Sequence, residues 1–219
     1  MTDIERILNS ARTDPRLQTL MSNCLNRAGY QQYLVQHLVN GLMFKEGKND
    51  SPAFTLGFQW GNYPFGLIFV GEKFSNLLTD NELEFVILHE FGHIIKNHIV
   101  TSSLVWLGKS FIVSLIADIL EVSQRTAQDI LGGLKALYML LSGKKTIEEE
   151  AKAQIELEAD KYAVNIQGVK EPAISTLLKL SEGNIRAPTH VTVDGRFPFP
   201  ITTYEERIEA IRNLQLGYF

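Results

Sequence analysis

Residues 89–93 read His-Glu-Phe-Gly-His, which places two histidines four positions apart with a glutamate directly after the first. Residues four apart on an α-helix share one face, so His89 and His93 can direct two imidazoles at one metal ion. Glu90 lies one step round the same turn, near enough to act on a water held by that metal. Two histidine ligands and a carboxylate base form the HExxH arrangement of zinc peptidases, so the pattern predicts metal-assisted hydrolysis with Glu90 as the general base.

This chemistry requires a helix, and the flanking sequence predicts one over roughly residues 80–98. Thr79 and Glu82 have the spacing of a capping box, and no proline follows before His98. On such a helix His98 would lie about 140° round from His93, which excludes it from the same metal and favours a structural or surface role. The helix is also supported by apolar residues that recur close to helical spacing, at Leu83, Val86, Ile87, Ile94 and Ile95. The alternative to a metal site is a buried helix with two histidines that bind no metal.

A second group of acidic residues, Glu156-Leu157-Glu158-Ala159-Asp160, lies on another predicted helix, residues 148–163. A catalytic zinc site needs three protein ligands and one open position, and Glu156 is the economical third ligand. Asp160 shares the face of Glu156 one turn later and would fix the tautomer of a ligand histidine. A solvated charged face is the alternative for such a stretch, but the preceding HExxH favours a site for one zinc ion per chain.

Together these motifs resemble the HtpX-like heat-shock metalloproteases and the type I CAAX prenyl endopeptidases, which are gluzincins. The resemblance is specific in its pairing of HExxH with ExEAD. It implies His89, His93 and Glu156 as zinc ligands, Glu90 as the base and Asp160 as the partner of a ligand histidine. The matched segments are 67–70, 77–83, 89–93 with His98, 156–160 and, weakly, Glu205-Glu206-Arg207-Ile208.

The C-terminal part departs from this family pattern. Members often carry a His-Pro pair shortly before the C-terminal Glu-Arg, whereas Phe197-Pro198-Phe199-Pro200 stands there without a histidine. A tetrahedral intermediate needs a hydrogen-bond donor for its oxyanion, and His190 lies in the loop closest in sequence to the missing residue. We therefore take His190 as the second candidate catalytic residue. An exposed loop histidine without a role is the alternative.

The rest of the chain predicts the elements around these two helices. Residues 3–46 look helical, and strands at 53–60 and 65–70 are separated by turn residues that favour a hairpin. We expect a mostly helical α+β zinc-peptidase domain with the HExxH helix, a second zinc-ligand helix and a small antiparallel sheet. One strand of the hairpin should edge the cleft, where an extended peptide would bind as an added strand.

Residues 99–143 predict an apolar helical hairpin inserted into a single metallopeptidase domain, residues 1–219. Two apolar segments, 104–120 and 130–141, are joined by Ser123-Gln124-Arg125-Thr126. A membrane-spanning helix needs about 20 apolar residues, and Lys109 divides the first segment. We expect a buried hairpin or one that forms a homodimer, with peripheral membrane contact as the alternative.

Composition limits the partners and the compartment. The net charge is −4, so the composition does not indicate nucleic-acid binding. Cys24 is the single cysteine, which excludes a zinc site made of cysteines. The first residues lack a basic region followed by an apolar run, so we expect a cytoplasmic protein. The predicted function is a zinc metalloendopeptidase acting on peptides or proteins. The alternatives are a latent or non-catalytic zinc-binding scaffold, or a membrane-associated chaperone-like protein built on the hairpin.

Overall fold

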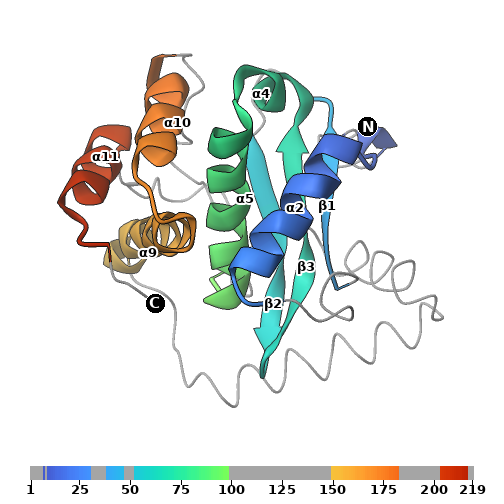
Figure 1. The fold of residues 1–219 in the computed structure, drawn as a ribbon, viewed down its shortest axis with the longest axis horizontal. Helices are drawn as coiled ribbons and strands as arrows, with labels where there is room; N and C mark the ends of the chain where they lie inside the picture. The colour runs from blue at the N-terminus through green and yellow to red at the C-terminus, as the bar shows by residue number, and fades with distance from the viewer. Residues whose placement is uncertain are drawn as a thin grey trace. The chain divides into compact units, whose positions relative to one another are not determined.

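The computed structural model describes residues 7, 9–30, 38–46, 52–98, 149–182 and 203–216, and the structural statements below concern these residues. They form a small sheet and several helices, which confirms the predicted mostly helical α+β class (Figure 1). The elements are, in chain order, α2 (Pro15–Arg27), β1 (Val39–Phe44), β2 (Ala53–Trp60), β3 (Tyr63–Gly71), α4 (Glu72–Leu77), α5 (Asp80–Ile95), α9 (Glu149–Gln167), α10 (Glu171–Glu182) and α11 (Tyr204–Asn213).

The sheet has three strands in the order β1-β3-β2. β2 and β3 form the predicted antiparallel hairpin, and Gly61 adopts a positive φ of 58° in the turn between them. β1 pairs in parallel with β3, so the sheet is mixed rather than wholly antiparallel. The prediction of helix throughout residues 3–46 is wrong at β1, because a short apolar run fits a buried strand as well as it fits a helix.

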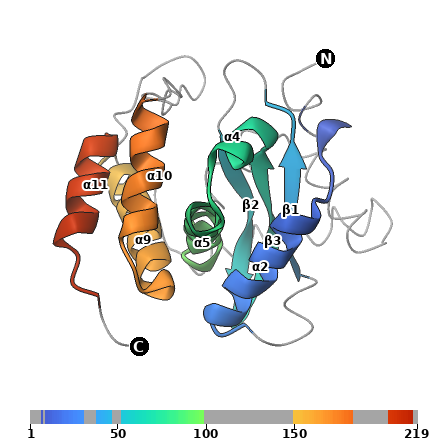
Figure 2. The same ribbon diagram turned by 45° about the horizontal axis from the view of Figure 1, so that its top comes forward.

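Helix α5, which carries the HExxH motif, packs between two layers. On one side it contacts the sheet and lies beside α2, and on the other side it contacts α9 and α10. Figure 2 shows α9, α10 and α11 grouped on the side of α5 opposite the sheet. Every residue of α5 from Glu82 to Ile94 is buried, so the motif lies in the interior between the layers.

Glycines set the spacing on both sides of α5. A Cβ at Gly92 would lie 3.3 Å from Ala159 Cα, so Gly92 lets the backbone of α9 approach the motif. On the sheet side, Gly57 and Gly66 pair across β2 and β3, and a Cβ at Gly66 would lie 2.8 Å from Ile94 Cδ1. Backbone rather than side chain therefore borders α5 at these points.

Two predictions fall outside the described residues. They are the apolar hairpin of residues 99–143, with the domain arrangement built on it, and the placement of His190. None of the helices that the structure describes is long and apolar enough to cross a membrane.

Candidate metal centre

The first turn of α5 fixes the start of the motif helix. Thr79 caps it as predicted, because its hydroxyl accepts from the Glu82 N–H at 3.4 Å and its own N–H donates to the Glu82 carboxylate at 2.7 Å. Glu82 also accepts hydrogen bonds from Ser175 and Lys179 of α10, at 2.6 and 2.7 Å. Burial opposes the charge of Glu82, but these donors outweigh it and lower its pKa to about 2. An ionised carboxylate thus ties α5 to α10.

Three potential metal donors converge between α5 and α9. The Nε2 atoms of His89 and His93 are 3.1 Å apart, and the Glu156 carboxylate oxygens lie 3.4 Å from the first and 3.6 Å from the second. One ligand atom from each residue falls within 4.8 Å of the others. Two imidazole nitrogens and one carboxylate oxygen match the donor set of a catalytic zinc site, and three ligands leave a fourth position open. The residues therefore fit zinc.

The second ring nitrogen of His89 faces a buried ion pair. His89 Nδ1 lies 2.8 Å from Asp160 Oδ1, the contact expected for a residue that fixes the histidine tautomer. Arg207 of α11 donates to both Asp160 oxygens at 2.7 Å, and its Nη1 lies 3.2 Å from a Glu156 oxygen. Only 1% of the Asp160 surface and 9% of the Arg207 surface are exposed. Arg207 therefore holds two of the carboxylates around the site in place.

Sequence reasoning did not assign Arg207 a role. It follows the capping box of α11, in which Thr203 and Glu206 exchange hydrogen bonds, so the start of this helix is well defined. The weak family match at 205–208 was the available signal. A contact over 47 residues of sequence, from Arg207 to Asp160, depends on how the helices pack and has no local pattern.

Burial and neighbouring charges set the protonation of the donors. Burial lowers the pKa of His93 to about 3, so this imidazole is neutral. Burial also opposes a charge on His89, but the hydrogen bond and charge of Asp160, together with Glu156, raise the pKa of His89 to about 10. Burial opposes the charge of Glu156 as well, yet the two histidines and Arg207 hold its pKa well below the usual range. A cation that binds here meets an ionised carboxylate and must displace a proton from His89.

Glu90, the predicted base, is buried on α5 directly after His89. Burial raises the pKa of Glu90 to about 7, although the neighbouring His89 acts in the opposite direction. A carboxyl group that titrates near neutral pH is well suited to accept a proton in one step and return it in the next.

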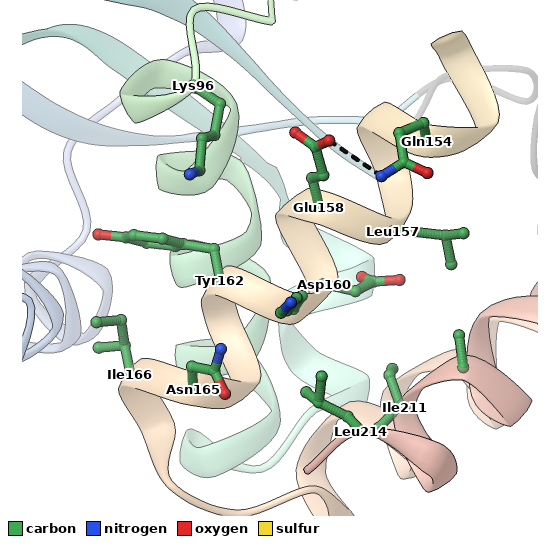
Figure 3. Close-up of a pocket in the computed structure, with 12 residues that line it drawn as sticks. Lys96, Gln154, Leu157, Glu158, Asp160, Tyr162, Asn165, Ile166, Ile211 and Leu214 are labelled. Carbon is green, nitrogen blue, oxygen red and sulfur yellow. Dashed lines mark hydrogen bonds between the residues drawn. The ribbon is translucent and has the colours of Figure 1, made fainter. Parts of the chain in front are cut away.

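A surface pocket of about 740 Å³ lies along α9 (Figure 3). It is bordered by Lys96 at the end of α5 and by Ile211 and Leu214 in and after α11. Figure 3 shows Gln154 and Glu158 joined by a hydrogen bond on one side of α9. None of the three metal donors is among the described residues that line the pocket, so we do not place a substrate there.

One family profile and one known protein are similar to this chain. The sequence profile of peptidase family M48 matches residues 11–215. Over 125 residues the chain is 30% identical to the metalloprotease LoiP of Escherichia coli (strain K12). The aligned residues are 54% of this chain and 46% of that protein, so the alignment spans about half the length of each.

Proposed function

Because the chain belongs to peptidase family M48, a family of zinc metallopeptidases, we propose that it is a zinc-dependent endopeptidase acting on peptides or proteins. The observation that carries the proposal is the convergence of His89, His93 and Glu156 within 4.8 Å. The third donor is a glutamate from a separate helix, which is the gluzincin arrangement that the resemblance to HtpX-like proteases implies. Within family M48 we therefore propose the type represented by the HtpX-like proteases and the type I CAAX prenyl endopeptidases, which share this arrangement.

Each residue of the centre then has a role in hydrolysis. His89, His93 and Glu156 hold the zinc, which when bound supplies Lewis acidity and lowers the pKa of a water towards 7. Glu90 accepts a proton from the attacking water and later passes it to the leaving amine. Asp160 accepts the Nδ1–H of His89, which leaves the Nε2 lone pair of that histidine free for the metal.

An extended peptide needs an edge strand beside this centre. Of the two strands considered from the sequence, β3 lies in the middle of the sheet and β2 lies at its edge. β2 also packs against α5, so we propose that the peptide adds to β2 through backbone hydrogen bonds. Asn97 Oδ1 already accepts the N–H of Gln59 at 2.7 Å, so the peptide would pair with the residues before Gln59.

Two further proposals concern segments outside the described residues. We propose that residues 99–143 control access to the cleft or self-association, because the charge of Lys109 would cost at least about 2.5 kcal/mol at the centre of a bilayer. Co-sedimentation with liposomes that resists high salt and alkaline washing would contradict this and favour membrane contact.

For His190 we propose a hydrogen bond to the oxyanion. His190→Ala should lower kcat by about 10²- to 10³-fold with little change in KM, because such a bond forms mainly in the transition state. An unaltered kcat would remove His190 from the mechanism.

The proposed activity can be tested with casein. Wild-type protein should cleave it, a chelator should abolish cleavage, and added zinc should restore it. Glu90→Gln should retain stoichiometric zinc but lose cleavage, because an amide cannot accept the proton of the water. Glu156→Ala should bind zinc more weakly. Stoichiometric zinc in a wild-type protein that cleaves nothing would favour the non-catalytic scaffold, and near wild-type turnover in Glu90→Gln would exclude Glu90 as the base.

A further inference from the structure

The C-terminal end of α5 turns the chain back on the metal motif. The helix ends at Ile95, and Asn97 adopts a left-handed φ of 55°. The Asn97 N–H then donates to Ile94 O at 3.1 Å, and the His98 N–H donates to His93 O at 2.9 Å. These two bonds define a Schellman motif, in which the chain reverses over the last turn. The expectation that the helix continues to His98 is therefore wrong.

The reversal brings the His98 ring against the ring of His93. Their Nδ1 atoms are 3.2 Å apart, and the two ring centroids are separated by 5.3 Å. The other ring nitrogen of His98 lies 3.3 Å from Glu158 Oε2 on α9. The side chain of His98 is only 9% exposed, whereas that of Glu158 is 41% exposed. His93, His98 and Glu158 thus form a connected row that leads from the metal centre towards solvent.

One arrangement of protons satisfies this whole row. His93 uses Nε2 as its donor atom to the metal, so its ring proton is on Nδ1. That N–H can donate only if the Nδ1 of His98 carries a lone pair. The proton of a neutral His98 is then on Nε2, where it donates to the carboxylate of Glu158. Each group in the row meets a complementary partner.

We propose that His98 is a positioning residue for the metal centre, which accepts the Nδ1–H of His93 and donates to Glu158. The inference rests on the proposed role of His93 as a zinc ligand. Hydrogen bonds of this kind fix the tautomer and ring orientation of a metal-bound histidine and raise its basicity. His98 holds His93 as Asp160 holds His89, although it touches neither metal nor substrate.

A pair of substitutions separates this role from packing. In His98→Asn the amide oxygen takes the place of Nδ1 and still accepts the bond from His93, whereas His98→Leu fills similar space and accepts nothing. We expect His98→Leu to weaken zinc binding by about 10- to 100-fold and His98→Asn to stay close to the wild type. The dissociation constant is measured with zinc alone, in competition with a chromophoric chelator, on proteins whose folding is checked by circular dichroism.

Heteronuclear NMR of the imidazole nitrogens in the zinc-bound wild type supplies the second readout. The spectra should show the ring proton of His93 on Nδ1 and that of His98 on Nε2. Because this measurement uses only the wild-type protein, it tests the inference even if His98→Leu fails to fold. Unchanged affinity in His98→Leu, equal losses in both variants, or a proton on Nδ1 of His98 would overturn the inference. Failure of the proposed zinc site looks different, because His93→Ala would then bind zinc as well as the wild type does. Failure of the proposed peptidase activity alone would appear as zinc binding without cleavage of casein.

Discussion

His89 and His93 lie one turn apart on the same helix, but the groups behind their second ring nitrogens differ. Behind His89 stands the buried ion pair of Asp160 with Arg207, supplied by two helices from distant parts of the chain. Behind His93 stands His98, five residues along the chain, with Glu158 partly in solvent. Both rings are buried, but an unpaired charge in the interior costs far more than an unpaired neutral imidazole. Loss of the ion pair behind His89 should therefore destabilise the fold, whereas loss of His98 behind His93 should lower the stability much less.

The largest effect should follow from breaking the ion pair. Asp160→Ala leaves the Arg207 guanidinium buried without its main partner, which should lower the free energy of unfolding by about 3–5 kcal/mol. The same change frees the ring of His89, so zinc affinity should fall by about 10- to 100-fold. Denaturant unfolding and chelator competition measure the two quantities.

The double variant Asp160→Leu/Arg207→Leu is the matched control. Replacing both charges by apolar side chains should recover much of the stability without recovering zinc affinity. If the double variant binds zinc as the wild type does, Asp160 has no positioning role, and the contrast between the two histidines disappears.

An intermediate effect should come from Asn97, which acts on the His93 side alone. Asn97→Ala places a residue that disfavours the left-handed region at φ 55°, at a cost of about 1–2 kcal/mol, and shifts His98 away from His93. Zinc affinity should therefore fall by a smaller factor than in Asp160→Ala. Asn97→Gly keeps the positive φ and loses only the bond to Gln59, so it should bind zinc better than Asn97→Ala. If Asn97→Ala changes the NMR chemical shifts of the His89 imidazole as much as those of the His93 imidazole, the two histidines are not supported independently.

The smallest effect should come from Glu82, at the far end of the same helix. Glu82→Gln keeps the capping spacing but loses the charge that binds Lys179, which should cost about 1 kcal/mol at neutral pH and leave zinc affinity unchanged. The pKa of Glu82 falls from 4.5 to about 2 on folding, so its stabilisation is complete above pH 4.5 and is lost as the pH falls towards 2.

Unfolding of metal-free protein across this pH window provides the measurement. The difference in stability between the wild type and Glu82→Gln should shrink steadily as the pH falls from 4.5 to 2. A difference that stays constant would mean that the carboxylate is not ionised in its bonds to α10.

The sequence predicted those parts of the centre that follow a local pattern. The capping box, the HExxH face and the spacing of Glu156 and Asp160 all depend on helical periodicity, and the structure places these residues as that periodicity requires. Arg207 was missed because its contact is made only when α11 packs against α9. β1 was missed because a short run of apolar residues is compatible with either a buried strand or a helix.

His98 shows a different limit. The angle of about 140° between His93 and His98 applies only to a continuous helix, and α5 ends at Ile95. Helical periodicity makes no prediction for residues beyond that point. Asparagine is a residue that commonly ends helices in the left-handed conformation, and Asn97 was therefore a usable stop signal. Asn97 predicts a reversal of the chain rather than a further turn of helix.

The paired glycines of the sheet have a consequence for how related chains can diverge. Because Gly57 and Gly66 carry no side chains, Ile94 rests on the backbone of β2 and β3, which brings the metal helix close to the edge strand. A methyl group at either position would clash with the backbone of the facing strand as well as with Ile94. The two glycines thus let the metal helix pack through Ile94 on strand backbone, and substitution at either position would disturb both the hairpin and this contact. If a peptide pairs with β2 as proposed, differences in substrate preference between related chains should arise at positions of β2 other than Gly57.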